Sequence, residues 1–124
     1  MEIKRSDIMQ TNILEYLEKT VTRVPEKTAY ADDRTALTFR QVYDCSRSIG
    51  SFLHSRGICR EPVTVFMKKS PAAVAAFFGT VYGGNFYVPL DEEMPGYRMK
   101  LIMETTGSRA VICDEKTRAV MDGI

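Results

Sequence analysis

The chain has 124 residues, of which 44% are hydrophobic and 27% are charged, and its formal net charge is +1. This length suffices for one modest core but not for two independent domains. The near-neutral charge gives no electrostatic footprint for nucleic acid or for an anionic membrane, so neither partner is expected. Cys45, Cys59 and Cys113 form no CxxC pair. We therefore expect no disulfide framework, no cysteine metal site and a cytoplasmic location.

The first third of the chain predicts a helix followed by a hairpin. Asn12 and Glu15 have the spacing of a capping box, and an apolar stripe of helical periodicity follows and ends at Pro25. The stripe consists of Leu14, Leu17, Val21 and Val24. Residues 28–31 and 36–39 predict two short strands, because a polar turn separates them. Residues 1–10 are expected to be flexible.

A second helix is predicted from Thr38, which has a capping-box partner in Gln41. Gly57 is expected to adopt the left-handed conformation that ends this helix. Its buried face is expected to comprise Val42, Cys45, Ile49, Phe52 and Leu53.

Residues 63–67 are β-branched and apolar, which predicts a central strand. The following helix, 72–82, is apolar nearly all round, so we expect it to be buried. Ser70 is its expected N-cap and Pro71 suits its first position. Two glycines would let a neighbouring backbone approach this helix closely: Gly79 and Gly83.

Residues 86–90 predict another buried strand, and a helix is expected to start at Pro95 and end at Gly107. The residues expected to face inward from that helix are Leu101, Ile102 and Thr105. Residues 110–113 predict a further apolar strand, and 115–121 a further helix.

Alternating strands and helices indicate an α/β fold, a mainly parallel sheet built from βαβ units with right-handed crossovers. A parallel sheet needs helices on both faces, and few are available here. We therefore expect residues 1–124 to be a single, incomplete domain. The uncharged run 70–90 is long enough to suggest a membrane span, but residues 83–85 (Gly-Gly-Asn) and Pro89 would break such a helix, so none is predicted.

Two polar clusters follow predicted strands. Lys68 and Lys69 precede a helix N-terminus and could hold a phosphate or carboxylate, although a solvated loop with a helix cap explains them more simply. Asp91, Glu92 and Glu93 could bind a divalent metal or act as acid and base. Acidic residues ahead of a helix also simply favour its dipole, and that is the interpretation we prefer.

Residues 105–109 (Thr-Thr-Gly-Ser-Arg) have the composition of a phosphate loop, but they follow a helix and lack the lysine of a P-loop. They are therefore predicted to form a helix cap. His54, the single histidine, lies in the last turn of a helix with no acid or nucleophile placed beside it. The sequence thus predicts no catalytic, cofactor-binding or metal-binding residue.

Two segments carry a family resemblance. Residues 37–42 (LTFRQV) resemble the first core motif of the adenylate-forming superfamily. Residues 84–91 (GNFYVPLD), followed by Pro95 and Arg98, resemble the second core motif of that superfamily. The likeness covers residues 11–114, and the second motif looks most like nonribosomal peptide synthetase adenylation domains and D-alanine–carrier-protein ligases. The departures are Tyr82-Gly83, where lysine-alanine is usual, and Glu92, where a proline often follows.

The resemblance implies the N-terminal part of an adenylate-forming enzyme's large domain. The implied full-length enzyme uses ATP and Mg²⁺ to convert an amino acid or other carboxylic acid to an acyl-adenylate. It then passes the acyl group to a carrier-protein phosphopantetheine or to coenzyme A. The phosphate loop and the catalytic lysine of such enzymes lie beyond these motifs, so this chain alone is expected to be inactive. Alternatives are an acyl-CoA synthetase portion or a non-catalytic interaction module that self-associates through an uncovered apolar face.

Overall fold

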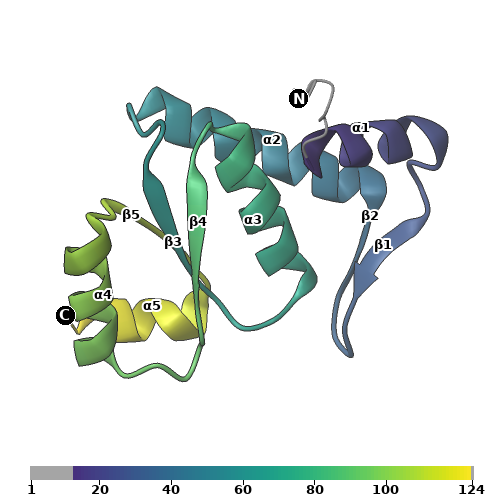
Figure 1. Ribbon diagram of the computed structural model, residues 1–124. Coiled ribbons are helices and arrows are strands. Elements are labelled where there is room, and N and C mark those ends of the chain that lie inside the picture. The colour runs from purple at the N-terminus through teal and green to yellow at the C-terminus, as the bar shows by residue number, and fades with distance from the viewer. Residues whose placement is uncertain (1–12, 124) are drawn as a thin grey trace, which may run out of the picture.

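The computed structural model describes residues 13–123 as alternating helices and strands (Figure 1). The elements are α1 (Ile13–Arg23), β1 (Thr28–Ala31), β2 (Ala36–Thr38), α2 (Phe39–Ser55), β3 (Pro62–Phe66), α3 (Pro71–Tyr82), β4 (Phe86–Leu90), α4 (Gly96–Thr106), β5 (Ala110–Cys113) and α5 (Glu115–Asp122). The capping box predicted at Asn12 and the flexibility expected of residues 1–10 lie outside the described residues.

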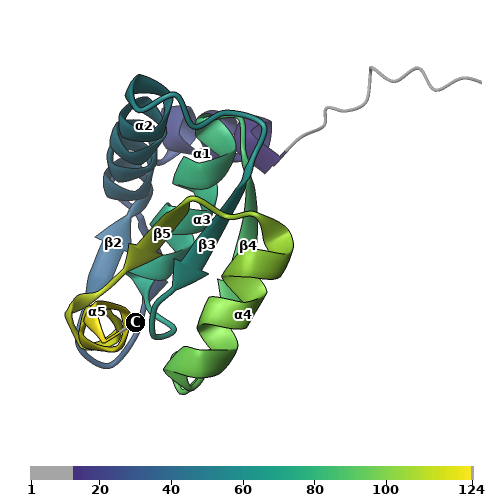
Figure 2. The same ribbon diagram turned by 90° about the vertical axis from the view of Figure 1, so that its left-hand side faces the viewer.

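Three parallel strands form the main sheet in the order β4-β3-β5. Val63 of the central strand is in register with Tyr87 on one side and Ala110 on the other. β1 and β2 form a separate antiparallel pair, which confirms the predicted hairpin. Figures 1 and 2 show α2 and α3 on one face of the sheet and α4 on the other, as right-handed crossovers require.

β3 is buried from Val63 to Phe66, as its apolar composition predicts. β4 is different, because Phe86 and Tyr87 are 57% and 41% exposed. The prediction that residues 86–90 are a buried strand was therefore wrong. Within the described chain, β4 pairs with a neighbouring strand on one side only and is therefore an edge strand. Its amino-acid composition does not reveal this position.

α2 and α3 pack closely because glycines line their contact. A Cβ atom on Gly79 would lie 2.6 Å from the Ile49 Cβ, and one on Gly83 would lie 3.2 Å from the Gly50 carbonyl oxygen. This confirms the close approach predicted for both glycines of α3. The same packing corrects the predicted buried face of α2, in which Cys45 and Phe52 are exposed. Small residues, Ser46 and Gly50, take the buried positions instead because they permit the short helix–helix distance.

A small apolar core joins α1 to this helix pair. Leu17 and Val21 of α1 pack with Val42 of α2 and Phe78 of α3. The predicted N-caps are confirmed, since the Thr38 and Gln41 side chains form a reciprocal capping box and the Ser70 hydroxyl accepts from a backbone N–H of α3.

α4 lies on the opposite face and buries little. Met99 is fully buried, whereas Leu101 is 61% exposed, Ile102 is half-buried and Thr105 is exposed. The predicted inward face was thus only partly right, because Ile102 is half-buried but the fully buried side chain of α4 is Met99, three residues earlier.

The predicted caps at the helix C-termini are present, with positive φ at Gly57 and Gly107. No helix within residues 13–123 is long and apolar enough to cross a membrane.

Candidate functional site

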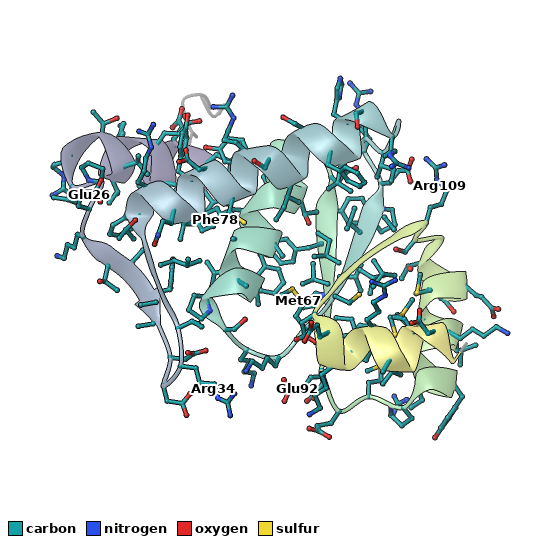
Figure 3. The ribbon with its side chains drawn as sticks, turned by 180° about the vertical axis from the view of Figure 1, so that it is seen from behind. Glu26, Arg34, Met67, Phe78, Glu92 and Arg109 are labelled. Atoms are coloured by element: carbon teal, nitrogen blue, oxygen red, sulfur yellow. The ribbon has the colours of Figure 1, made fainter. Side chains whose placement is uncertain are left out.

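The sequence-predicted charged clusters meet at one end of the molecule. A cleft of about 330 Å³ lies where the loops after β3 and β4 approach the β1–β2 turn. Figure 3 shows Met67, Glu92 and Arg34, one from each of these loops, at this end. The charged residues that line the cleft are Asp32, Asp33, Lys68, Lys69, Asp91, Glu92 and Glu93.

The loop after β3 is held by α5 and by its own helix cap. The backbone N–H of Lys68 donates to Asp114 Oδ2 at 2.9 Å, and the Ala73 N–H donates to Ser70 Oγ at 3.2 Å. Burial acts to raise the pKa of Asp114, but the N–H groups of Thr117 and Lys68 outweigh it, so this pKa lies below its usual value. The Lys68 N–H and the Ser70 Oγ therefore both form hydrogen bonds that hold the loop. The side chains of Lys68 and Lys69 line the cleft.

The acidic residues after β4 also have local partners. Asp91 Oδ1 accepts the Glu93 N–H at 2.8 Å, and Glu93 lies 3.6 Å from the Lys116 ammonium group. Glu92 differs, because its Oε1 is buried without a hydrogen-bond partner. Within residues 13–123, no group of three potential ligands is arranged to hold a metal ion.

The β1–β2 turn contributes a further carboxylate. Asp32 Oδ1 accepts the backbone N–H groups of Thr35 at 2.7 Å and Arg34 at 2.9 Å. These bonds, the one from Thr35 foremost, hold the pKa of Asp32 below its usual value, and Lys68 adds a smaller effect. Asp32 therefore stabilises its turn and stays negatively charged.

The charge balance of the cleft decides what it can bind. Five carboxylates and two ammonium groups line the cleft, and Lys116 pairs with one of those carboxylates, Glu93, so negative charges outnumber positive charges in the lining. This excess of carboxylates does not favour binding of the polyphosphate of ATP. The same excess favours the simpler interpretation of Lys68 and Lys69 as part of a solvated loop with a helix cap.

The loop at residues 105–109 is a helix cap, as predicted. The N–H groups of Gly107 and Ser108 donate to the Met103 carbonyl at 2.9 and 3.2 Å. The Ser108 hydroxyl donates to the Ala110 carbonyl at 2.9 Å and accepts from Thr64 at 2.9 Å. These groups are engaged within the chain, so the loop does not present an open cradle to a phosphate.

Sequence reasoning gave no role to Asn85, which lies within the second motif. Its Oδ1 accepts the Glu61 N–H at 3.1 Å, and its Nδ2 donates to the carbonyls of Ile58 at 3.1 Å and Gly83 at 3.2 Å. Asn85 is 7% exposed, and it ties the entry to β3 to the entry to β4. A polar residue between two glycines and the apolar strand β4 was the signal that could have revealed it.

A cluster formed by Glu18, Arg47 and Tyr82 also escaped sequence reasoning. The three residues come from α1, α2 and α3, so no local spacing relates them. Glu18, Arg47 and Tyr82 line one pocket. His54, for which the sequence indicated no partner, lines the same pocket and lies near the C-terminal end of α2.

The fold and its second motif match a known family. The model of the AMP-binding enzyme family matches residues 17–123. The chain belongs to the AMP-binding enzyme family. It is 30% identical over 110 residues to a D-alanine–D-alanyl carrier protein ligase of Listeria monocytogenes, covering 87% of this chain and 22% of that protein. It is 26% identical over 100 residues to bacitracin synthase 3 of Bacillus licheniformis, covering 80% of this chain and 2% of that protein.

Solved structures of the family share this fold. A benzoate CoA ligase of Burkholderia xenovorans superposes with a TM-score of 0.82 at 24% identity, covering 90% of this chain and 23% of that one. The chain therefore has the α/β fold of adenylate-forming enzymes, and it spans about a fifth of the carrier-protein ligase that it matches.

Proposed function

We propose that this AMP-binding chain is part of the scaffold of an ATP-dependent ligase that forms an acyl-adenylate and passes the acyl group to a thiol. The observation that carries the proposal is the family match over residues 17–123. In this proposal residues 1–124 form a single, incomplete domain, and the groups that bind ATP and Mg²⁺ belong to other parts of the ligase.

An amino acid is the substrate class we favour, with a carrier-protein phosphopantetheine as the thiol. The support is the resemblance of residues 84–91 to the amino-acid-activating branch and the similarity to the Listeria carrier-protein ligase. Coenzyme A is the alternative acceptor, since the fold is shared with a benzoate CoA ligase.

The test is ATP–pyrophosphate exchange by the purified 124-residue chain, with a panel of amino acids and aryl and fatty acids. We expect no acid-dependent exchange, because the described residues form neither a phosphate cradle nor a metal cluster. Exchange that depends on one added acid would overturn the proposal that this chain alone is inactive. A blot of source-cell extract with an antibody to the chain tests the proposal that the chain is part of a larger ligase. If it is, the band should lie well above 14.0 kDa.

A second candidate is a non-catalytic module that self-associates. Its support is an apolar groove of about 460 Å³ between α2 and the open edge of β5, together with the exposed Phe86 and Tyr87 on β4. Analytical ultracentrifugation and binding of a hydrophobic dye test this candidate. A strictly monomeric chain that binds no dye would rule it out.

A further inference from the structure

Three side chains with unused hydrogen-bond donors converge on a pocket outside the charged cleft. The pocket has a volume of about 530 Å³ and lies between α1, α2 and the end of α3. Its lining residues are Glu18, Arg47, Gly50, Ser51, His54 and Tyr82. Ser51 and His54 are exposed, and their side chains form no hydrogen bond with another of residues 13–123.

Arg47 is held in position without a carboxylate partner. Its Nη1 donates to the Tyr43 hydroxyl at 2.7 Å, and its guanidinium carbon lies 5.5 and 5.7 Å from the ring centroids of Tyr43 and Tyr82. No carboxylate of the described residues lies within 4.0 Å of it. A guanidinium has five N–H donors in a planar fork that fits a carboxylate, and only one of the five is used here.

Glu18 adds a negative charge to the lining of the pocket. Glu18 Oε2 accepts the Tyr82 hydroxyl at 2.9 Å, while Oε1 has no partner within the described part of the chain. This contact, after burial, raises the pKa of Tyr82, so the phenol stays a neutral donor. Tyr82 thus spans the gap between the separated charges of Arg47 and Glu18.

We propose that this pocket binds a small zwitterion, with its carboxylate held by Arg47, Ser51 and His54 and its ammonium group held by Glu18. A phosphate dianion is disfavoured because it would meet the Glu18 carboxylate. This site is independent of the proposed ligase function, because it uses none of the cleft residues.

An NMR titration of the 124-residue chain tests the proposal. The ligands are glycine, β-alanine and 4-aminobutanoate, which place the two charges at increasing separations, with acetate, methylammonium and inorganic phosphate as single-charge or anionic comparisons. We expect saturable shifts of the amides of residues 47–54 and of the Arg47 Nε–H signal with at least one of the three amino acids. Acetate and methylammonium should each bind about tenfold more weakly or worse, since each makes half of the charged contacts.

Variants assign the effect to the pocket. Arg47→Gln and Glu18→Gln should each weaken binding about tenfold or more, because each removes one charge-assisted contact. Arg56→Gln is the matched control, since Arg56 lies over Phe52 away from the pocket and its loss should leave affinity unchanged. Thermal unfolding of each variant verifies that it is folded, and Arg47→Lys, which keeps the charge but not the fork, serves where Arg47→Gln is unstable.

Three outcomes would overturn the proposal. The first is the absence of saturable shifts with every amino acid up to its solubility limit. The second is tighter binding of inorganic phosphate than of the amino acids. The third is unchanged amino-acid affinity in folded Arg47 and Glu18 variants.

Discussion

Asn85→Asp should destabilise the chain in a pH-dependent way. The side-chain nitrogen of Asn85 donates to the carbonyls of Ile58 and Gly83, at 3.1 and 3.2 Å. An ionised carboxylate at this 7%-exposed position would place a negative oxygen against both carbonyls. The protonated acid keeps one donor and loses only one of the two bonds.

The sign of the pH effect follows from linkage. Burial and the two carbonyls raise the pKa of the introduced acid in the folded state above its unfolded value of about 3.9. Below that pH the acid is protonated in both states, and the loss relative to wild type is about 1 kcal/mol, the typical worth of one hydrogen bond. Above it the loss grows by about 1.4 kcal/mol per pH unit until the folded-state pKa is reached.

Urea unfolding of wild type, Asn85→Asp and Asn85→Ala at pH 4 and pH 7 measures this. Asn85→Ala removes three hydrogen bonds at about 0.5–1.5 kcal/mol each, with no dependence on pH. The difference between wild type and Asn85→Asp should therefore widen from pH 4 to pH 7, while the alanine difference stays constant. A pH-independent loss for Asn85→Asp would refute the assignment of its Nδ2 to the two carbonyls.

Three further changes test the helix packing, a buried hydrogen bond and an ion pair. Gly79→Ala places a Cβ 2.6 Å from that of Ile49, which should cost about 1–3 kcal/mol of unfolding free energy in urea titrations. Thr117→Val should cost about 1–3 kcal/mol, because the hydroxyl of Thr117, 1% exposed, donates to a β3 carbonyl at 2.6 Å. Arg109→Gln should raise the pKa of Glu61 measured by NMR, since the Arg109 side chain, with Nε 3.0 Å from Oε1, holds that pKa below its usual value.

Each of these has a control. Gly96→Ala places a Cβ 3.5 Å from its nearest neighbour and should leave stability unchanged or raised, so an equal loss at both glycines would contradict the packing argument. Thr117→Ser keeps the hydroxyl and should retain more stability than Thr117→Val. The depressed Glu61 pKa contributes stability above the unfolded value of about 4.3 that is lost as the pH falls through the folded value, and this acid-side loss should shrink in Arg109→Gln.

The order of elements could be predicted because its signals are local. Thr38 and Ser70 cap the helices that follow them, and Gly79 marks the close helix contact. The exposure of β4 could not be predicted, since it depends on which strands flank it and not on its own composition. The burial of Ser46 in place of Cys45 failed for a similar reason, because the short distance between α2 and α3 favours small side chains over apolar ones.

The candidate sites also combine features that are local in the sequence with contacts between distant segments. Lys68, Lys69 and the acidic residues after β4 were recognisable as clusters, but the contribution of Asp32 and the anchoring by Asp114 depend on contacts between distant segments. The excess of carboxylates over ammonium groups in the cleft becomes visible only when all these segments are brought together. The Arg47 pocket lay beyond sequence reasoning because three helices build it.

The small buried area of α4 has a consequence for motion. Met99 is the fully buried side chain of this helix. The pairings of β3 with β4 and β5 do not involve the helix. Few buried apolar contacts mean a low free energy of local opening. Amide hydrogens of α4 should therefore exchange with solvent well before those of β3, and proteases should first cleave near Tyr97 and Leu101. We therefore expect α4 to separate from its face of the sheet by local opening more readily than α2 and α3 separate from the other face.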